Sequence, residues 1–241
     1  MKPTVLVPAT DTVAAFRGTE FDQGVPKSLI RFALGEGPRK YMIQYAMNGV
    51  DKMIRRCVGL PASVTSREEE RMRAADLVDE GVEVWYFESD GQAHTILQLI
   101  EQAGVSGPVL VVNPDVMMVS SRAIRNFVAA MSNVGTAESG ALVFPQDDAA
   151  SYSFVSEAGW FTRAVEKRRI SSFAMVSVSW FADAGELARR LRTVVSSAKG
   201  EPRLADVFAF YSRNWAVVAP VGAVAEFGTP EKLRATIERF R

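Results

Sequence analysis

The chain has 241 residues, 48% of them hydrophobic, so it is long enough to bury a sizeable core. Its 28 lysines and arginines balance 28 aspartates and glutamates, which excludes a bulk positive field for nucleic acid or an anionic membrane. The single cysteine, Cys57, excludes an internal disulfide, and the single histidine, His94, argues against histidine-rich metal sites and a serine–histidine–aspartate triad.

The cysteine usage indicates a reducing compartment. Met1 leads almost directly into an expected strand, and no later segment approaches the roughly 18 uncharged apolar residues of a membrane span. We therefore expect a cytoplasmic protein that is neither exported nor membrane-anchored.

In the first half of the chain, short apolar runs rich in β-branched residues alternate with longer amphipathic stretches, as buried strands and their covering helices do. In chain order we expect a strand at 4–7, a helix at 39–48, a strand at 54–60, a helix at 67–79, a strand at 82–87, a helix at 95–102, a strand at 109–112, a helix at 121–131 and a strand at 141–144. The charged run at 67–71 is expected to be a solvated face at a helix start.

The second half is richer in expected strands. They lie at 151–156, 174–181 and 215–221, with helices at 186–195, near 204–211 and at 231–239. No low-complexity segment, repeat or linker divides the chain. The pattern predicts one α/β domain over residues 1–241, a Rossmann-like three-layer fold with a mostly parallel mixed sheet and a β-rich later half.

The strongest chemical signal is Val109-Leu-Val-Val-Asn-Pro-Asp-Val116, a buried-type strand that delivers Asp115 to a loop. Ligand crevices form at the carboxyl ends of strands in open α/β sheets, and a carboxylate there is suited to Mg²⁺. The alternative is a turn that leads into a helix capped by Ser120, since asparagine, proline and aspartate favour turns without any ligand.

A second signal is Val25-Pro-Lys27-Ser28, which follows the first strand and a long loop. A lysine placed there can reach back over the same crevice and offer a point charge to a phosphate. A loop lysine is more often simply solvated.

These two segments resemble, in order and rough spacing, those of the sugar-1-phosphate nucleotidyltransferases, the family that includes glucose-1-phosphate thymidylyltransferases. Further similar segments follow over nearly the whole chain: Asp90-Gly-Gln-Ala-His-Thr-Ile-Leu97, Tyr152-Ser-Phe-Val155, Gly159, Val165-Glu166-Lys167, Ile170-Ser-Ser-Phe-Ala174 and Phe227-Gly-Thr-Pro-Glu231.

The resemblance implies a GT-A-like sheet and transfer of a nucleotidyl group from a nucleoside triphosphate to a sugar 1-phosphate, with release of pyrophosphate, in carbohydrate biosynthesis. Such chemistry relies on alignment and charge neutralisation. The implied site consists of Asp115 and Glu226 for Mg²⁺, Lys27 near the nucleotide phosphates, Gly91 and Gln92 at the substrate, and Lys167, positioned by Glu166, at the sugar phosphate.

One departure concerns the loop after the first strand, which in the family is glycine-rich and carries an arginine. Here residues 8–17 contain no glycine, and Asp11 would repel phosphate unless it binds metal. Arg17 stands slightly displaced from the usual arginine and is the candidate replacement. Ser177 stands near a position where relatives often have glycine, which would narrow the sugar site.

Three hypotheses remain open: an active nucleotidyltransferase with an altered loop, a non-catalytic relative that binds a nucleotide, a sugar nucleotide or a protein partner, and a nucleotide-sugar-dependent GT-A glycosyltransferase. We expect neither a nucleic-acid nor a membrane partner, and homo-oligomerisation stays open. His94 is interpreted as a helix-start residue satisfied locally, and Cys57 as a buried inert thiol.

Overall fold

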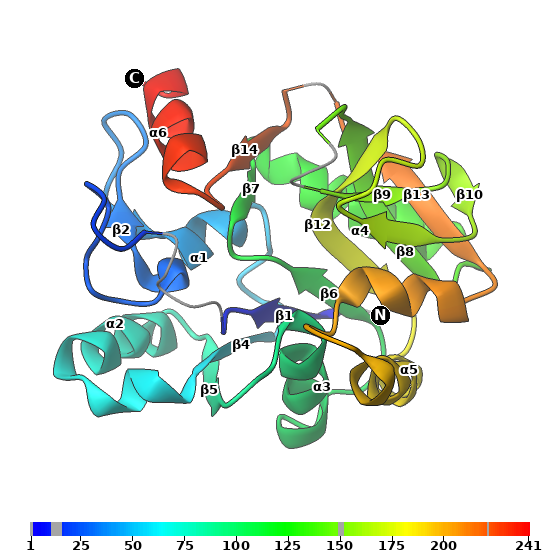
Figure 1. Cartoon of the computed structure of the whole chain (residues 1–241), viewed down its shortest axis with the longest axis horizontal. Helices are drawn as coiled ribbons and strands as arrows, with labels where there is room; N and C mark the ends of the chain where they lie inside the picture. Colours follow the sequence, from blue (N-terminus) through cyan, green and yellow to red (C-terminus); the bar gives the residue numbers. More distant parts are fainter. Residues whose placement is uncertain (1, 11–15, 149–151, 221) are drawn as a thin grey trace.

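A computed structural model describes residues 2–10, 16–148, 152–220 and 222–241. A long mixed sheet forms its centre, in the strand order β10-β13-β8-β12-β6-β1-β4-β5 (Figure 1). These strands are β1 (Thr4–Pro8), β4 (Arg56–Pro61), β5 (Glu83–Phe87), β6 (Val109–Val112), β8 (Ser139–Pro145), β10 (Gly159–Phe161), β12 (Phe173–Phe181) and β13 (Asn214–Val218). The antiparallel pair β9 (Ser153–Val155) and β11 (Ala164–Glu166) joins the sheet through β12.

The pairings give the main sheet a dominant direction. Strands β5, β4, β1 and β6 are parallel, β12 runs against β6 and β8, and β13 is parallel to β8. Thus β12 and the edge strand β10 oppose the other strands on this path. The carboxyl ends of β1, β4, β5 and β6 therefore meet at one edge of the sheet, where ligands bind in open α/β folds.

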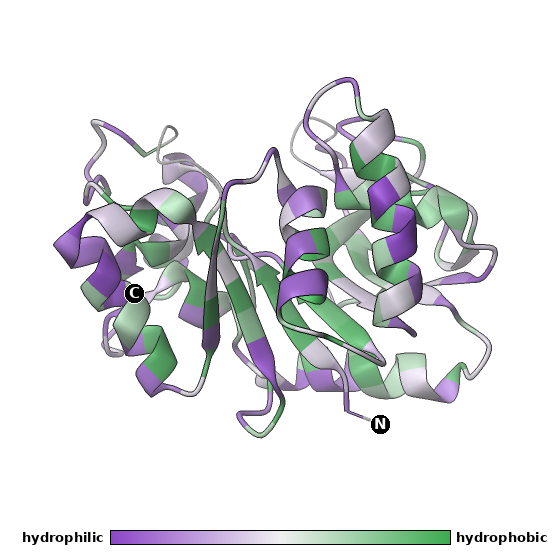
Figure 2. Ribbon diagram, turned by 90° about the horizontal axis from the view of Figure 1, so that it is seen from below, coloured by the Kyte–Doolittle hydropathy of each residue, from purple (hydrophilic) through white to green (hydrophobic). Residues whose placement is uncertain are grey.

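Helices cover both faces of the sheet. One face is packed by α3 (Gln92–Gln102), α5 (Ala184–Ser197) and the 3₁₀ helix η4 (Leu204–Phe210). The other is packed by α1 (Met42–Ala46), α2 (Glu68–Asp79), α4 (Ser121–Asn133) and α6 (Pro230–Arg239). Figure 2 shows hydrophobic strands between helices whose outer residues are largely hydrophilic.

The three layers follow from the strand period of two. Val5 and Val7 of β1 enter one hydrophobic cluster, whereas Leu6 between them enters the other. The same alternation separates Cys57 from Val58. Each central strand is therefore apolar on both faces, which explains the continuous apolar runs in the sequence.

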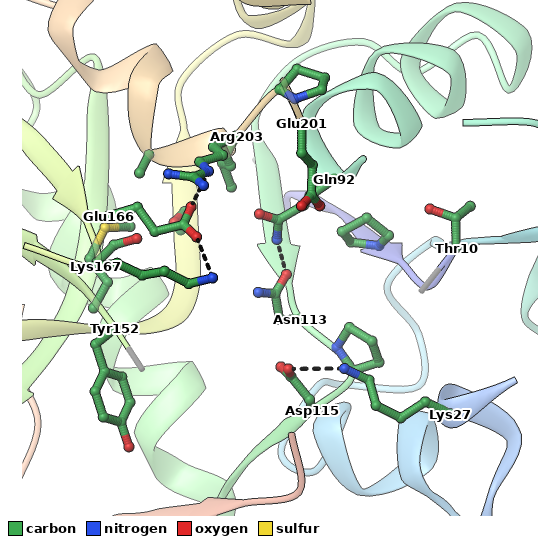
Figure 3. Close-up of a pocket in the computed structure, with 18 residues that line it drawn as sticks. Thr10, Lys27, Gln92, Asn113, Asp115, Tyr152, Glu166, Lys167, Glu201 and Arg203 are labelled. Carbon is green, nitrogen blue, oxygen red and sulfur yellow. Dashed lines mark hydrogen bonds and ion pairs between the residues drawn. The ribbon is translucent and has the colours of Figure 1, made fainter. Parts of the chain in front are cut away.

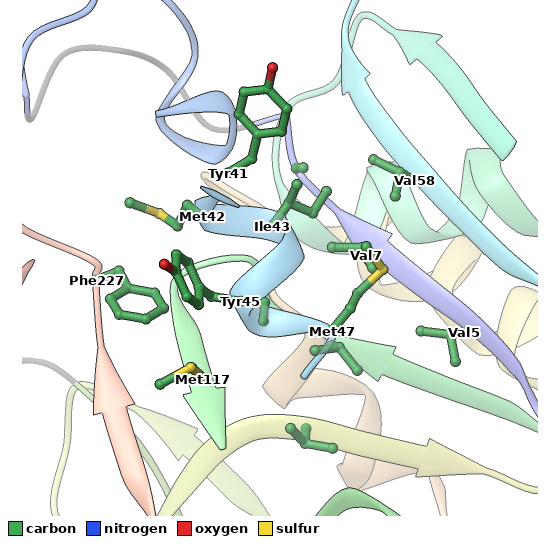
Figure 4. Close-up of a cluster of buried hydrophobic side chains, with 14 of the residues drawn as sticks. Val5, Val7, Tyr41, Met42, Ile43, Tyr45, Met47, Val58, Met117 and Phe227 are labelled. Carbon is green, nitrogen blue, oxygen red and sulfur yellow. The ribbon is translucent and has the colours of Figure 1, made fainter. Parts of the chain in front are cut away.

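The short helix α1 lies between the sheet and a small separate ribbon. The ribbon is the antiparallel pair β7 (Val116–Met118) and β14 (Val224–Glu226). Figure 4 shows Ile43 and Met47 beside Val5 and Val7, with Tyr45 beside Phe227. The Tyr45 and Phe227 ring centroids are 5.9 Å apart. This packing fixes the ribbon above the carboxyl edge of β6.

Most expected elements are present, with shifted ends, and the strand at 109–112 has the expected bounds. The helix expected at 39–48 is wrong in its first part, because β3 (Lys40–Tyr41) pairs with β2 (Arg31–Phe32) before α1 begins. The expected segment near 204–211 is a 3₁₀ rather than an α-helix. Strands β7, β10, β11 and β14 were not expected, since three residues are too few to display a periodic pattern.

The charged run at the start of α2 is a solvated face except at one position. Glu68 and Glu69 are exposed, but Glu70 is only 4% exposed. Its Oε2 atom has no hydrogen-bond partner among the described residues, and Arg67 Nη1 lies 3.4 Å from Oε1. Burial raises the pKa of Glu70.

Candidate functional site

A cleft of about 330 Å³ opens at the carboxyl edge of the sheet, and polar side chains dominate its walls. The walls are formed by Pro8 and Thr10 after β1, Lys27 of η2 (Lys27–Leu29), Gln92 of α3, residues 113–115 after β6, Tyr152 and Ser153 at β9, Glu166 and Lys167 at β11, Met175 and Ser179 of β12, and residues 201–205. Segments far apart in sequence thus converge where strand ends meet.

Asp115 and Lys27 contact each other on one side of this cleft. The Lys27 Nζ and Asp115 Oδ2 atoms are 3.4 Å apart, and Lys27 as a residue is only 8% exposed. The backbone of Asp115 is fixed in place, because its oxygen accepts a 2.8 Å hydrogen bond from the amide of Phe227. The chain continues into β7 before α4, so Asp115 lies between two strands and does not cap a helix.

Three further polar side chains, those of Gln92, Asn113 and Thr10, line the same side of the cleft. The Gln92 amide donates to Asn113 Oδ1, which positions both side chains at the cleft (Figure 3). The hydroxyls of Thr10 and Thr95 are 2.6 Å apart, and Thr95 also contacts Ser89. This wall is therefore built from neutral hydrogen-bonding groups around the Lys27–Asp115 pair.

The opposite side of the cleft carries a second charged group: Glu166, Lys167 and Arg203 (Figure 3). Glu166 Oε2 lies 3.0 Å from Arg203 Nε, and Glu166 Oε1 lies 3.9 Å from Lys167 Nζ. Burial raises the pKa of Glu166, and the charges of Arg203 and Lys167 oppose that rise.

Lys167 has an unusual backbone. Its φ is +53°, the left-handed region, which costs a residue with a Cβ about 1–2 kcal/mol. The Lys167 amide donates a 2.8 Å hydrogen bond to the backbone oxygen of Tyr152 and fixes this turn. Strained residues of this kind concentrate at functional sites, because the surrounding structure must hold them in place.

Gly91 and Gln92 at the start of α3 have different surroundings. Gln92 lines the cleft, whereas Gly91, with φ +148°, lies beneath Glu201 and Pro202. A Cβ at Gly91 would approach the Cγ of Glu201 to 2.5 Å. The Ala93 amide donates to the Pro202 oxygen at 3.2 Å. The segment before η4 thus covers the helix start and brings Glu201 to the cleft.

Besides Gly91, two further expected site residues do not line the cleft. Arg17 is exposed on the turn after the first loop. Glu226 lies in β14 opposite Val116 and contacts Lys232, with 2.9 Å between Glu226 Oε1 and Lys232 Nζ. Residues 11–15 of the altered loop and the side chain of Ser177 lie outside what the structure describes.

Several cleft residues carried no signal of their own in the sequence, notably Arg203, Glu201 and Ser179. Arg203 and Glu201 flank a proline in a segment that reads as an ordinary turn. Ser179 is fully buried in β12, lines the cleft, and its hydroxyl has no partner among the described residues. A serine in an apolar strand was the one available hint, since an unpaired buried hydroxyl is costly.

The two carboxylates expected to hold Mg²⁺ differ in position, because Asp115 lines the cleft and Glu226 does not. No group of three histidine, cysteine, aspartate or glutamate side chains in the described ranges could hold a metal ion. Magnesium often uses one or two carboxylates together with substrate phosphates, and the Asp115 carboxylate, which lines the cleft, is a group of the kind that would hold it. Both carboxylates contact an ammonium group: Asp115 Oδ2 lies 3.4 Å from Lys27 Nζ, and Glu226 Oε1 lies 2.9 Å from Lys232 Nζ.

Cys57 and His94 lie apart from this chemistry. Cys57 is buried, and burial raises the pKa of its thiol to about 12, so it is not a thiolate nucleophile. His94 Nδ1 accepts a hydrogen bond from the Asp90 amide at 3.3 Å, a local contact at the start of α3.

Among the helices of the described ranges, none has the length and apolar character that a membrane-spanning helix needs.

Comparison with solved structures finds the same fold in other proteins. No protein-family model and no curated protein sequence matches the chain. A nucleoside-diphosphate-sugar pyrophosphorylase from Vibrio cholerae RC9 superimposes with a TM-score of 0.75 at 14% identity, covering 98% of this chain and all of that one.

Two further structures have the same fold. A putative glucose-1-phosphate thymidylyltransferase from Bacillus anthracis, in complex with a sucrose, has a TM-score of 0.73 at 15% identity and covers 99% of this chain and 95% of its own. A UDP-glucose pyrophosphorylase complexed with UDP-glucose has a TM-score of 0.72 at 14% identity, covering 100% and 98%. The α/β nucleotidyltransferase-like fold is therefore shared over essentially the whole length of both chains.

Proposed function

We propose that this protein transfers a nucleotidyl group from a nucleoside triphosphate to a sugar 1-phosphate and releases pyrophosphate. The observation that carries the proposal is one cleft with Lys27 and Asp115 on one side and Glu166, Lys167 and Arg203 on the other. The shared fold with sugar-nucleotide pyrophosphorylases supports it. The product, a nucleotide sugar, would serve carbohydrate biosynthesis.

In this proposal, each side of the cleft binds one of the two substrates. A phosphate oxygen of the sugar 1-phosphate attacks the α-phosphorus, and the bond to the oxygen that bridges to the β-phosphorus breaks. Pyrophosphate leaves with that electron pair. We assign Lys27 to the triphosphate and Lys167 to the sugar phosphate, because opposed cations hold the two anions in line and offset their repulsion.

Mg²⁺ bound to Asp115 would add positive charge for the triphosphate. The protein's own groups would orient the rest of the substrates. Gln92 and Asn113 offer amide donors and acceptors to the nucleotide, and Glu166 offers a carboxylate to sugar hydroxyls.

The test is incubation with a panel of nucleoside triphosphates and sugar 1-phosphates in Mg²⁺, with detection of released pyrophosphate. We expect turnover for at least one pair, and a drop of about 100-fold or more in Lys167→Met, the size typical for loss of one transition-state contact. The exposed Lys52→Met is the matched control and should keep full activity. If no combination of nucleoside triphosphate and sugar 1-phosphate releases pyrophosphate, the proposal is contradicted.

A second candidate is a relative that binds nucleotide sugars without turnover. It is favoured by the loop after β1, which has no glycine between Pro8 and Arg17 to bring backbone amides close to a triphosphate. Titration calorimetry with nucleotide sugars separates the two candidates. Binding without any pyrophosphate release would favour this one.

A further inference from the structure

Lys232 contacts both the Glu226 carboxylate and the Tyr152 hydroxyl, which come from two other elements. Lys232 Nζ lies 2.9 Å from Glu226 Oε1 and 3.5 Å from the Tyr152 hydroxyl. The same ammonium lies 4.6 Å from the centroid of the Tyr152 ring. The side chains of Glu226 and Lys232 are both only 27% exposed, so this pair is poorly screened by solvent.

The backbone around this cluster is fixed. The Glu226 amide and oxygen both contact the hydroxyl of Thr236, and β14 pairs with β7. The hydroxyl of Thr229 caps α6 by accepting from the Lys232 amide at 3.3 Å, with Pro230 at the first helical position. Lys232 therefore projects from a defined place in the first turn of α6.

That place is electrostatically unfavourable for a lysine. The first turn of a helix carries the positive end of the helix dipole, which favours acidic side chains and repels a cation by about 0.3–1 kcal/mol. The contacts with Glu226 and Tyr152 offset this cost. The arrangement thus puts a positive charge where the local backbone disfavours one.

The backbone of Glu226 lies next to that of Asp115. It pairs with Val116, the residue after Asp115, and the Phe227 amide binds the Asp115 oxygen. A second carboxylate beside Asp115 would ordinarily help to hold a divalent ion, because affinity rises with the number of charged ligands. Here the ammonium group of Lys232 neutralises the Glu226 carboxylate, so a side chain of the protein supplies the positive charge.

We propose that Lys232 takes the place of a divalent cation at Glu226, so that the protein binds a metal ion through Asp115 alone. The inference rests on the proposed function only in taking the cleft as a metal–nucleotide site. Lys232 is a positioning residue: it keeps Glu226 with Tyr152 and away from metal ligation.

The test is a titration of the protein with Mn²⁺ in the absence of nucleotide, in which electron paramagnetic resonance measures the bound Mn²⁺. Lys232→Met frees Glu226 to join Asp115, and we expect Mn²⁺ to bind at least about tenfold more tightly than to the native chain. Lys232→Arg keeps the positive charge and should match the native affinity. Lys52→Met removes an exposed charge elsewhere and controls for the change in net charge.

A second variant keeps the inference testable if Lys232→Met does not fold. Glu226→Gln in the native background should leave Mn²⁺ affinity unchanged within about twofold, because Glu226 is not a ligand there. An unchanged affinity in Lys232→Met, an equal gain in Lys232→Arg, or a clear loss in Glu226→Gln would overturn the proposal. Absence of pyrophosphate release would contradict the proposed function and leave these metal titrations unaffected.

Discussion

Asp115 combines a fixed backbone with a carboxylate that faces the cleft. Its side chain is 27% exposed, so it contributes little to core packing. We expect Asp115→Asn to weaken Mg²⁺-dependent nucleotide binding by about tenfold or more, while the free energy of unfolding changes by less than about 0.5 kcal/mol. Calorimetric titration with and without Mg²⁺, beside a melting curve, measures both. Equal nucleotide affinity in the variant with Mg²⁺ present would remove Asp115 from the site.

Glu70 gives a prediction about pH. Burial raises its pKa above the ordinary 4.5, so the folded chain holds a proton that the unfolded chain has lost, and stability falls as pH rises through this window. We expect Glu70→Gln to raise the free energy of unfolding at pH 7 by about 1 kcal/mol, since the neutral amide removes a negative charge from a buried position.

The sign can be checked by urea unfolding at several pH values. The advantage of Glu70→Gln over the native chain should be smallest near pH 4 and grow toward pH 7. The exposed neighbour Glu69→Gln is the matched control. An advantage that is largest in acid would refute this account.

At the scale of elements, the turn between β14 and α6 contacts the Asp115 side chain, which lines the cleft. A Cβ at Gly228 would lie 3.2 Å from Asp115 Oδ2, closer than ordinary van der Waals contact. We expect Gly228→Ala to push the Asp115 carboxylate aside and to weaken Mn²⁺ binding at least threefold, with a smaller effect on melting temperature.

Thr229→Ala is the natural comparison because it alters the same turn without touching Asp115. Loss of the α6 cap should cost about 1 kcal/mol of stability and leave Mn²⁺ affinity close to native. If Gly228→Ala binds Mn²⁺ as well as Thr229→Ala does, the contact with Asp115 is not decisive.

At the scale of the whole molecule, the cleft joins residues from Pro8 to Ala205, and we propose that residues 1–241 act as one domain. A ligand in such a cleft stabilises the fold as a unit. A nucleotide sugar at 100 times its Kd should add about 2.7 kcal/mol and raise the Tm by roughly 5–10 °C. Scanning fluorimetry over a panel of nucleotide sugars, with Lys167→Met as the reduced-shift control, checks this. A Tm that no nucleotide sugar raises would speak against the cleft as a binding site.

The layered α/β architecture could be predicted from the sequence, because apolar runs such as residues 109–112 indicate strands that are buried on both faces. The sequence also indicated that Asp115 follows such a strand, and the structure brings Asp115 and Lys27 together. Both results depend on local patterns and on the rule that parallel strands end at one edge.

Which side chains face each other across that edge could not be predicted from the sequence and depends on the three-dimensional fold. The pairing of Glu166 with Arg203 and that of Lys232 with Glu226 and Tyr152 depend on the order of the strands and on the path of the segments between them. Residues 40–41 form a strand because β2 lies beside them, although their own pattern favours a helix. Periodicity records the local environment of a residue, whereas these contacts join residues whose spacing in sequence carries no such record.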